Sequence, residues 1–262
     1  MHPALWISKT GLDAAQTDVA VISNNLANAS TVGFKKDRAI FEDLLYQNIN
    51  QPGGRSSADT ELPSGLMLGA GSKVVATQKA HTQGNMLTTE NALDMSIQGR
   101  GFFEIQQPDG SIAYTRNGQF TLNDEGQIVT PGAGFLLQPN ITVPEDAQQI
   151  TISQDGEVSA SIRGQADPQV LGQISLSDFV NMTGLQPIGQ NLYVETATSG
   201  APIQGVPGLE GLGTVVQGAL ETSNVNVTEE LVNLIESQRL YEMNSKVISA
   251  VDSMLGQVIQ QL

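Results

Sequence analysis

The segment LWISKTGLDAAQTDVAVISNNLANASTVGFKK, residues 5 to 36, decides the predicted fold. Its apolar and small residues recur at alternating steps of three and four, the spacing of a narrow seam along one face of a helix. The seam residues are Leu5, Ser8, Leu12, Ala15, Val19, Ile22 and Leu26. The pattern predicts a coiled-coil-like helix over residues 4 to 27, and Pro3 suits its first turn because proline lacks the N–H that would be unpaired there.

The chain is expected to leave this helix in the stretch rich in asparagine, serine and threonine that follows. Short polar side chains compete for backbone hydrogen bonds, and Gly33 permits a left-handed turn. The next segment, GFKKDRAIFEDLLYQ (33–47), predicts a short extended piece or a helical turn that lies on a neighbour. Its small basic cluster, Lys35, Lys36 and Arg38, is expected to be solvated, although a neighbour's acidic surface is a possible partner.

A second, longer helix is predicted at the other end of the chain, from Glu229 to about Gln260. Thr228 is its expected N-cap, and the acidic residues of its first turn favour the helix dipole. Its apolar residues form two stripes about 100° apart. The first is Leu231, Leu234, Tyr241, Ile248, Leu255, Ile259 and Leu262, and the second is Leu240, Val247, Val251, Met254 and Val258. Since one partner helix covers only one stripe, we expect the terminal helices to pair with each other and with further copies.

Between the helices the chain predicts a long loop and then β-structure. Residues 47–72 are rich in proline, glycine and serine, and their apolar residues favour a loop that docks on something. From about residue 73 to 220, short alternating segments are separated by turn sequences, which predicts an antiparallel meander or barrel-like sandwich. The turn sequences are PDG (108–110), RNG (116–118), NDEG (123–126), PGAG (131–134) and QDG (154–156). The predicted fold class is therefore α+β, with an antiparallel β-domain inserted between terminal helices.

The 262-residue chain carries a formal net charge of −15 and contains no cysteine. Residues 1–100 hold 8 basic and 9 acidic side chains, whereas residues 101–262 hold 4 and 18. Such an acidic surface repels phosphate groups, so nucleic acid and anionic lipid are poor partners. No run of eighteen apolar residues and no basic-then-apolar N-terminal pattern is present, so neither membrane insertion nor a cleaved signal peptide is expected.

An enzyme of the peptidoglycan-acting class is the main rival reading. Such an enzyme needs two carboxylates at a defined separation, usually near aromatic side chains. Asp109, Asp124 and Asp155 lie in turn sequences, where backbone capping explains them, and Trp6 is the only tryptophan. The two histidines are isolated in the sequence. We therefore expect no catalytic, metal-binding or cofactor-binding residues. A secreted β-protein of the adhesin type, a third class, leaves the paired helices unexplained.

Three segments resemble the axial proteins of the bacterial flagellum, which build its rod and hook. ISNNLANASTVGFK (22–35) resembles the signature of that family, and SNVNVTEELVNLIESQRLYEMNSKVI (223–248) resembles its C-terminal segment. LDMSIQGRGFFEI (93–105) and the following residues 114–139 are similar to the β-domain of its longer members. The signature residues are Asn24, Asn25, Leu26, Ala27, Asn28, Thr31, Gly33, Phe34 and Lys35. The insertion at 46–73 is similar to that of the distal rod, while a proximal rod or hook subunit remains an alternative.

The resemblance implies a helical homopolymer, a straight hollow shaft that transmits torque. Residues 1–30 and 224–262 would form the assembly domain, 31–73 a connecting segment, and 74–223 an outward-facing acidic β-domain. The implied partners are proximal rod proteins, the hook protein, the bushing rings of the periplasm and outer membrane, the type III export apparatus and a rod cap. The subunit would lie in the basal body, crossing the periplasm and outer membrane.

Two shorter segments carry more specific hypotheses. An apolar export-recognition element is implied by the resemblance, and Phe41, Leu44 and Leu45 are candidates for it, although ordinary packing is the favoured explanation of these residues. Residues 46 to 73 are hypothesised to act as a wedge between neighbouring subunits, which would resist bending of the shaft. The candidate wedge residues are Tyr46, Pro52, Leu62, Pro63, Leu66 and Leu68.

Overall fold

The structure is a computed structural model that describes residues 3–50, 64–163 and 167–260. The chain forms two compact units, and each is described by itself. The helical unit comprises residues 1–27, 37–79 and 226–262, and the β unit comprises residues 28–36 and 80–225. The predicted α+β class, with a helix at each end and an antiparallel β-rich middle, is confirmed.

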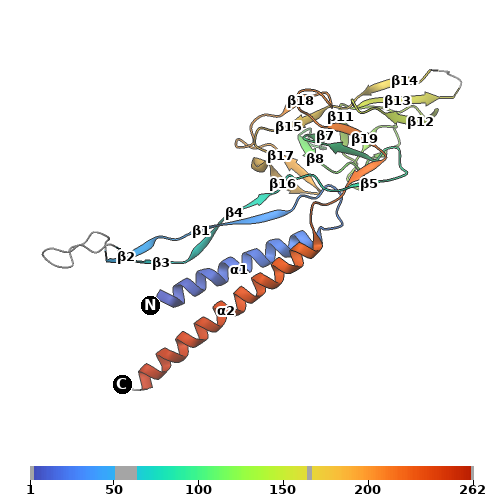
Figure 1. Cartoon of the computed structure of the whole chain (residues 1–262). Coiled ribbons are helices and arrows are strands. Elements are labelled where there is room, and N and C mark those ends of the chain that lie inside the picture. Colours follow the sequence, from blue (N-terminus) through green and yellow to red (C-terminus); the bar gives the residue numbers. More distant parts are fainter. Residues whose placement is uncertain (1–2, 51–63, 164–166, 261–262) are drawn as a thin grey trace. The chain divides into compact units, whose positions relative to one another are not determined.

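Two long helices, α1 (Pro3–Ala27) and α2 (Val227–Gln260), form the larger part of the helical unit. They lie side by side and run in opposite directions (Figure 1). The predicted N-cap of α2 is wrong by two residues. The Asn226 Oδ1 atom accepts a hydrogen bond from the Thr228 N–H at 3.1 Å, and the Asn226 carbonyl accepts one from Glu230 at 3.0 Å. Asparagine therefore caps the helix, because its side chain reaches a donor of the first turn.

In the described part of the chain, the helical unit also contains four strands, and they correct the prediction that residues 47–72 form an irregular loop. β1 (Asp37–Asp43) pairs antiparallel with β4 (Ser72–Lys79), and β2 (Tyr46–Asn50) pairs antiparallel with β3 (Leu66–Gly69). Between the two ladders the Leu44 N–H donates to the Gly71 carbonyl at 2.8 Å. The loop prediction failed because these strands pair across a long sequence separation and do not alternate clearly. Because β4 pairs with β1, residues 74–79 belong to the helical unit, although the β-domain was predicted to begin at residue 74.

The β unit is built from short strands that, within the described residues, pair only antiparallel. Its largest sheet has the order β16-β17-β8-β7-β11-β10-β9, and β15 joins β7 to β18. These strands are β7 (Phe102–Gln106), β8 (Ile112–Thr115), β9 (Thr121–Leu122), β10 (Ile128–Val129), β11 (Leu136–Gln138), β15 (Leu176–Asp178), β16 (Gln186–Gly189), β17 (Leu192–Val194) and β18 (Ile203–Gly205).

Smaller ladders complete the unit. Three strands, β12 (Ala147–Ile152), β13 (Glu157–Ile162) and β14 (Gln169–Gln173), form a second sheet. β6 (Met95–Gln98) pairs with β19 (Thr214–Gln217), and β5 (Met86–Thr88) pairs with β20 (Ala219–Glu221). A short 3-10 turn spans Met182–Gly184. The main core is buried between these sheets and contains, among others, Met95, Ile97, Phe103, Ile105, Phe120, Leu137 and Ile174.

Four of the five predicted turn sequences connect paired antiparallel strands. PDG joins β7 to β8, NDEG joins β9 to β10, PGAG joins β10 to β11, and QDG joins β12 to β13. RNG (116–118) is not such a turn, because β8 does not pair with β9 and Arg116 is only 6% exposed. The arginine of that sequence has a buried role, described below.

Tyr114 provides a test of the packing of the β unit. It lies in a second aromatic cluster, with its ring centroid 4.8 Å from that of Phe179, and burial together with the charges of Glu104 and Glu195 raises its pKa from 10.0 to about 12. A raised phenol pKa contributes stability that is complete below pH 10 and is lost as the pH rises through about 12. We expect the Tyr114 phenol to form tyrosinate only near pH 12 in an absorbance titration. The Tyr114→Phe variant should lack this late component, and its persistence would contradict the assignment.

Candidate assembly surfaces

Polar side chains fix the register of α1 against α2. The Asn25 Nδ2 atom donates to Glu230 Oε2 at 3.2 Å, and the Ser237 hydroxyl donates to the Asp18 carboxylate. Seven residues further along α2, Asn244 packs closely on Gly11, because a Cβ added to that glycine would lie 2.8 Å from the Asn244 Nδ2 atom. Each step of seven residues forward along α2 matches a step of seven back along α1. We call these three contacts the polar ladder.

The polar ladder was not predicted, since both the seam of the first helix and the stripes of the second are defined by residues that are mainly apolar. On α1 the predicted seam does face inward: Ser8, Ala15 and Ile22 are buried, and Leu5, Leu12, Val19 and Leu26 are half-buried. On α2, however, Glu230 and Ser237 are buried at 3% exposure each, together with Val251. The signal available in the sequence was the spacing of seven between Glu230, Ser237 and Asn244. Polar residues at such seam positions specify register at some cost in stability.

Six of the nine predicted interface residues of α2 whose side chains the structure describes are exposed in the single chain. Leu234 and Ile248 are half-buried and Val251 is buried. The exposed members of the two stripes are Leu231, Leu240, Tyr241, Val247, Met254 and Leu255. The side chains of Val258, Ile259 and Leu262 lie outside the described residues. A role of the exposed members in binding further copies stays a proposal.

The register can be tested by cross-linking, because the chain contains no cysteine. We expect the double variant Asp18→Cys, Ser237→Cys to form an intrachain disulfide on mild oxidation. The control Asp18→Cys, Asn244→Cys places the second thiol one heptad, roughly 10 Å, further along α2, which is too far for a disulfide. Gel mobility under non-reducing conditions distinguishes the two. Equal cross-linking of both variants would show that the helices slide freely.

The signature residue Asn25 also connects α1 to β1. Its side-chain amide donates to the Asp37 carbonyl at 2.8 Å, and its Oδ1 atom accepts from the Asp37 N–H at 2.8 Å. The Asp37 carboxylate in turn binds the Lys79 ammonium at 2.9 Å, which ties β4 to the same point. Asn25 is 2% exposed, so these bonds are shielded from water. The asparagine therefore holds α1, α2 and β1 together within the helical unit.

The second half of the signature belongs to the β unit. Thr31 and Asn28 share a turn, in which the Thr31 hydroxyl donates to Asn28 Oδ1 at 3.2 Å. Gly33 has φ +70°, as a left-handed turn requires, and a Cβ there would lie 2.7 Å from the Arg116 backbone. Phe34 follows at 8% exposure. A larger residue at position 33 would be strained both by its dihedral angle and by this contact.

A buried group of charges lies beside this turn and corrects the expectation that Lys35 is solvated. Lys35 is 1% exposed, and its Nζ atom lies 2.5 Å from Glu221 Oε1 and 2.8 Å from the Thr82 carbonyl oxygen. Glu221 Oε2 lies 3.3 Å from Arg116 Nη1, and Oε1 accepts the Gly84 N–H at 2.8 Å. Burial lowers the pKa of Lys35 against the opposing attraction of Glu221, and it also lowers the pKa of Arg116. One carboxylate thus serves two buried cations.

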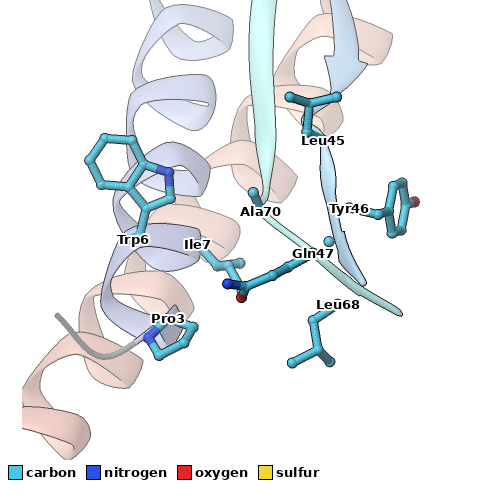
Figure 2. Close-up of a pocket in the computed structure, with 9 residues that line it drawn as sticks. Pro3, Trp6, Ile7, Leu45, Tyr46, Gln47, Leu68 and Ala70 are labelled. Atoms are coloured by element: carbon cyan, nitrogen blue, oxygen red, sulfur yellow. The ribbon is translucent and has the colours of Figure 1, made fainter. Parts of the chain in front are cut away.

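The antiparallel pair of β2 and β3, which we call the hairpin, borders an apolar groove next to the start of α1. Figure 2 shows the groove, which has a volume of about 530 Å³. Its lining comes from α1, from strands β2 and β3, and from the residues that directly flank these strands: Pro3, Trp6, Ile7, Leu45, Tyr46, Gln47, Leu68, Gly69 and Ala70. The link between β3 and β4 approaches α1 closely, since a Cβ on Gly71, which has φ +112°, would lie 2.1 Å from Thr10 Oγ1. The groove was not predicted, since its two sides are distant in the sequence.

The candidate wedge and export residues that the structure describes lie on or near this hairpin. Among the wedge residues, Tyr46, Leu66 and Leu68 are exposed, while Pro52, Leu62 and Pro63 lie outside the described residues. Among the export candidates, Leu44 is half-buried, but Phe41 is 42% and Leu45 is 89% exposed. Ordinary packing within the chain therefore does not explain Leu45. Both roles stay proposals.

Comparison with known proteins identifies the family. Three family models match: the flagella basal body rod protein model over residues 6–35, the flagellar hook protein FlgE/F/G D1 domain over 96–160, and the flagellar basal body rod FlgEFG protein C-terminal model over 216–261. A flagellar basal-body rod protein FlgG of Buchnera aphidicola (from Acyrthosiphon pisum) is 54% identical, across 99% of this chain and 100% of that protein. The chain belongs to the FlgG family of flagellar basal-body rod proteins.

Two proteins of Caulobacter vibrioides separate this family from a neighbouring one. The FlgG of that bacterium is 49% identical over 96% of both chains, whereas its FlgF is 31% identical over 100% of this chain and 98% of FlgF. Membership of the FlgG family makes the chain a structural rod protein and not an enzyme. Within the described residues, the structure contains no helix long and apolar enough to cross a bilayer.

Proposed function

We propose that this chain is the subunit of the distal rod, and that it polymerises helically into a straight, hollow shaft that passes torque from the motor to the hook. The observation that carries this proposal is the set of uncovered apolar residues on α2. A pair of helices that leaves Leu231, Leu240 and Val247 exposed needs further neighbours. Membership of the FlgG family makes copies of the same chain the natural neighbours.

The same observation suggests how the subunit is exported and assembled. Helices whose apolar stripes lack partners are marginally stable alone, so the termini are proposed to be largely unfolded during transit and to fold as they bind the growing tip. The proposed route is the flagellar type III export apparatus. The proposed location is the basal body, where the shaft crosses the periplasm and outer membrane and forms part of the export channel.

The shaft needs several further contacts in this proposal. Its lower end would meet the proximal rod proteins and its upper end the hook protein. The acidic β unit would face outward, toward the bushing rings of the periplasm and outer membrane, and a rod cap would guide assembly. A hollow shaft coated with like charge would rotate within such rings without adhering strongly to anionic surfaces.

Electron microscopy of isolated basal bodies tests the proposal. Cells that lack this chain should yield a shaft truncated before the outer membrane and without a hook, and expression of the chain in the same cells should restore both. A shaft truncated near the inner membrane would instead favour the proximal rod alternative. Complete basal bodies with hooks in the cells that lack the chain would overturn the assignment.

A further inference from the structure

Among the residues that the structure describes, the register of the helical unit leaves the end of α2 without a stretch of α1 opposite it. α1 has 25 residues and α2 has 34. The seven-residue step of the polar ladder places Val251 opposite Ala4, near the first residue of α1. The residues of α2 after Ser253 therefore extend roughly 10 Å beyond the start of α1, at 1.5 Å per residue. We call residues 253–260 the overhang.

The overhang continues the face of α2 that lies against α1. Val251 is 5% exposed, whereas Met254 and Leu255, one turn later, are 56% and 39% exposed. These three residues share one side of the helix, because steps of three and four return to the same face. In the sequence, Val258 and Ile259 recur at the same spacing. The apolar face that packs on α1 is thus prolonged past the point where α1 begins.

The groove at the start of α1 is also uncovered in the same chain. Trp6 is 49% exposed, Tyr46 is 59% exposed and Leu68 is 43% exposed, and all three line the groove. In Figure 2, Trp6 extends from α1, whereas Tyr46 and Leu68 extend from the strands beside it. Because the overhang and the groove are both exposed within a single chain, neither covers the other. Each therefore lacks an occupant that a second copy of this chain can supply.

The charges of the two surfaces suit contact between identical chains. Two copies with a net charge of −15 repel each other over most of their surfaces. The sequence SMLGQVIQQL (253–262) contains no charged side chain, and neither does the lining of the groove. The last turn of α2 contains no basic residue, so its carbonyl groups keep their partial negative charge. Beside the groove, the Lys9 ammonium lies 5.4 Å from the Trp6 ring and offers a complementary charge.

We propose that the overhang of one copy occupies the groove of the next copy in the assembled rod. This inference rests on the proposed function and names one contact within it. A reciprocal dimer would close after two copies, whereas a rod continues, so in this proposal the contact is head-to-tail and repeats from copy to copy. The apolar face of the overhang would then lie on Trp6 and Ile7, with Tyr46 and Leu68 closing the groove from the hairpin side.

Cross-linking in isolated basal bodies tests the contact. The double variant Tyr46→Cys, Leu255→Cys should give a series of covalent oligomers when assembled rods are treated with a short bismaleimide. Either substitution alone should leave monomers, because the chain has no other cysteine. Rods that assemble but give only monomers, or only an intrachain product, would overturn the inference and leave the proposed function standing. Failure of the unmodified chain to restore rods would overturn the proposed function instead.

A second pair of variants keeps the inference testable if the cysteine variants do not assemble. Leu255→Glu introduces a charge on the apolar face, and we expect it to lower the number of rods per cell about tenfold or more. Gln257→Glu introduces the same charge on the same exposed turn but off that face, and it should leave the number near that of the unmodified chain. Equal effects of the two substitutions would contradict the proposal.

Discussion

Replacing Glu221 by glutamine should destabilise the β unit by about 3–5 kcal/mol, the cost of removing one partner from a buried ion pair. The substitution keeps the size of the side chain but removes the charge that both Lys35 and Arg116 approach. Lys35 is 1% exposed and Arg116 is 6% exposed, so water cannot replace the lost carboxylate. Since Glu221 also accepts the Gly84 N–H, four separate segments of the β unit meet at this side chain.

Urea unfolding followed by near-ultraviolet circular dichroism measures this effect. The aromatic cluster of Phe102, Tyr114, Phe179 and Tyr193 supplies the signal of the β unit, whereas Trp6 belongs to the helical unit. The midpoint should fall without a change in slope. Glu157→Gln is the matched control, because Glu157 is exposed on the same unit and its charge should be worth less than about 0.5 kcal/mol. A loss below about 1 kcal/mol for Glu221→Gln would contradict the role assigned to the buried group.

The deficit of the Glu221→Gln variant should also shrink as the pH rises. Burial already lowers the pKa of Lys35 in the folded chain, and the attraction of Glu221 opposes that shift. Without the carboxylate the folded pKa should fall further below the unfolded value. A lysine in this condition makes stability rise with pH between its folded and unfolded pKa values, because the unfolded state binds more protons there. The free energies of unfolding of the variant and the unmodified chain are compared at about pH 7 and about pH 10. The difference between them should be smaller at the higher pH, and an unchanged difference would exclude this contribution of Lys35.

The helices could be predicted from the sequence because their signals are local. The steps of three and four from Leu5 to Leu26 fit only one regular structure, and α1 ends at Ala27 where asparagines and Gly33 follow. The same reasoning misplaced the start of α2, since both Asn226 and Thr228 can cap a helix. Which of them does so depends on backbone geometry that composition does not reveal.

The polar positions could not be predicted in the same way. Lys35 is buried only because Glu221, almost two hundred residues later in the chain, lies opposite it. A rule that assigns charged residues to the surface is right on average, and it fails where two charges are buried together. Glu230 and Ser237 were overlooked for a related reason, because a seam is usually recognised by its apolar members. The hairpin of β2 and β3 depends on pairing between segments that are separated by residues 51–65, and short exposed strands show no alternation.

Removing the hairpin should convert a straight rod into a curved one. The deletion of residues 46–69, with Leu45 joined to Ala70, is suited to this test because the Leu44 N–H donates to the Gly71 carbonyl at 2.8 Å and closes the ladder of β1 and β4 just before the cut. The deletion leaves α1 and α2, which are proposed to contact neighbouring copies, and it keeps Pro3, Trp6 and Ile7 of the groove for the proposed contact with the overhang. We therefore expect polymers to form.

Curvature follows from what the deletion removes. A shaft bends when subunits on one side slide together, and an element packed between them opposes that motion. A pair of hydrogen-bonded strands suits this role better than an irregular loop, because it holds its shape under load. β2 and β3 are paired, and Tyr46, Leu66 and Leu68 are 59%, 48% and 43% exposed. Electron micrographs of the deletion variant should show curved, hook-like assemblies. As the control, replacing Tyr46, Leu66 and Leu68 by serine keeps the hairpin but removes its apolar contacts, and it should give intermediate curvature. Straight rods from the deletion variant would show that stiffness resides in the helices alone.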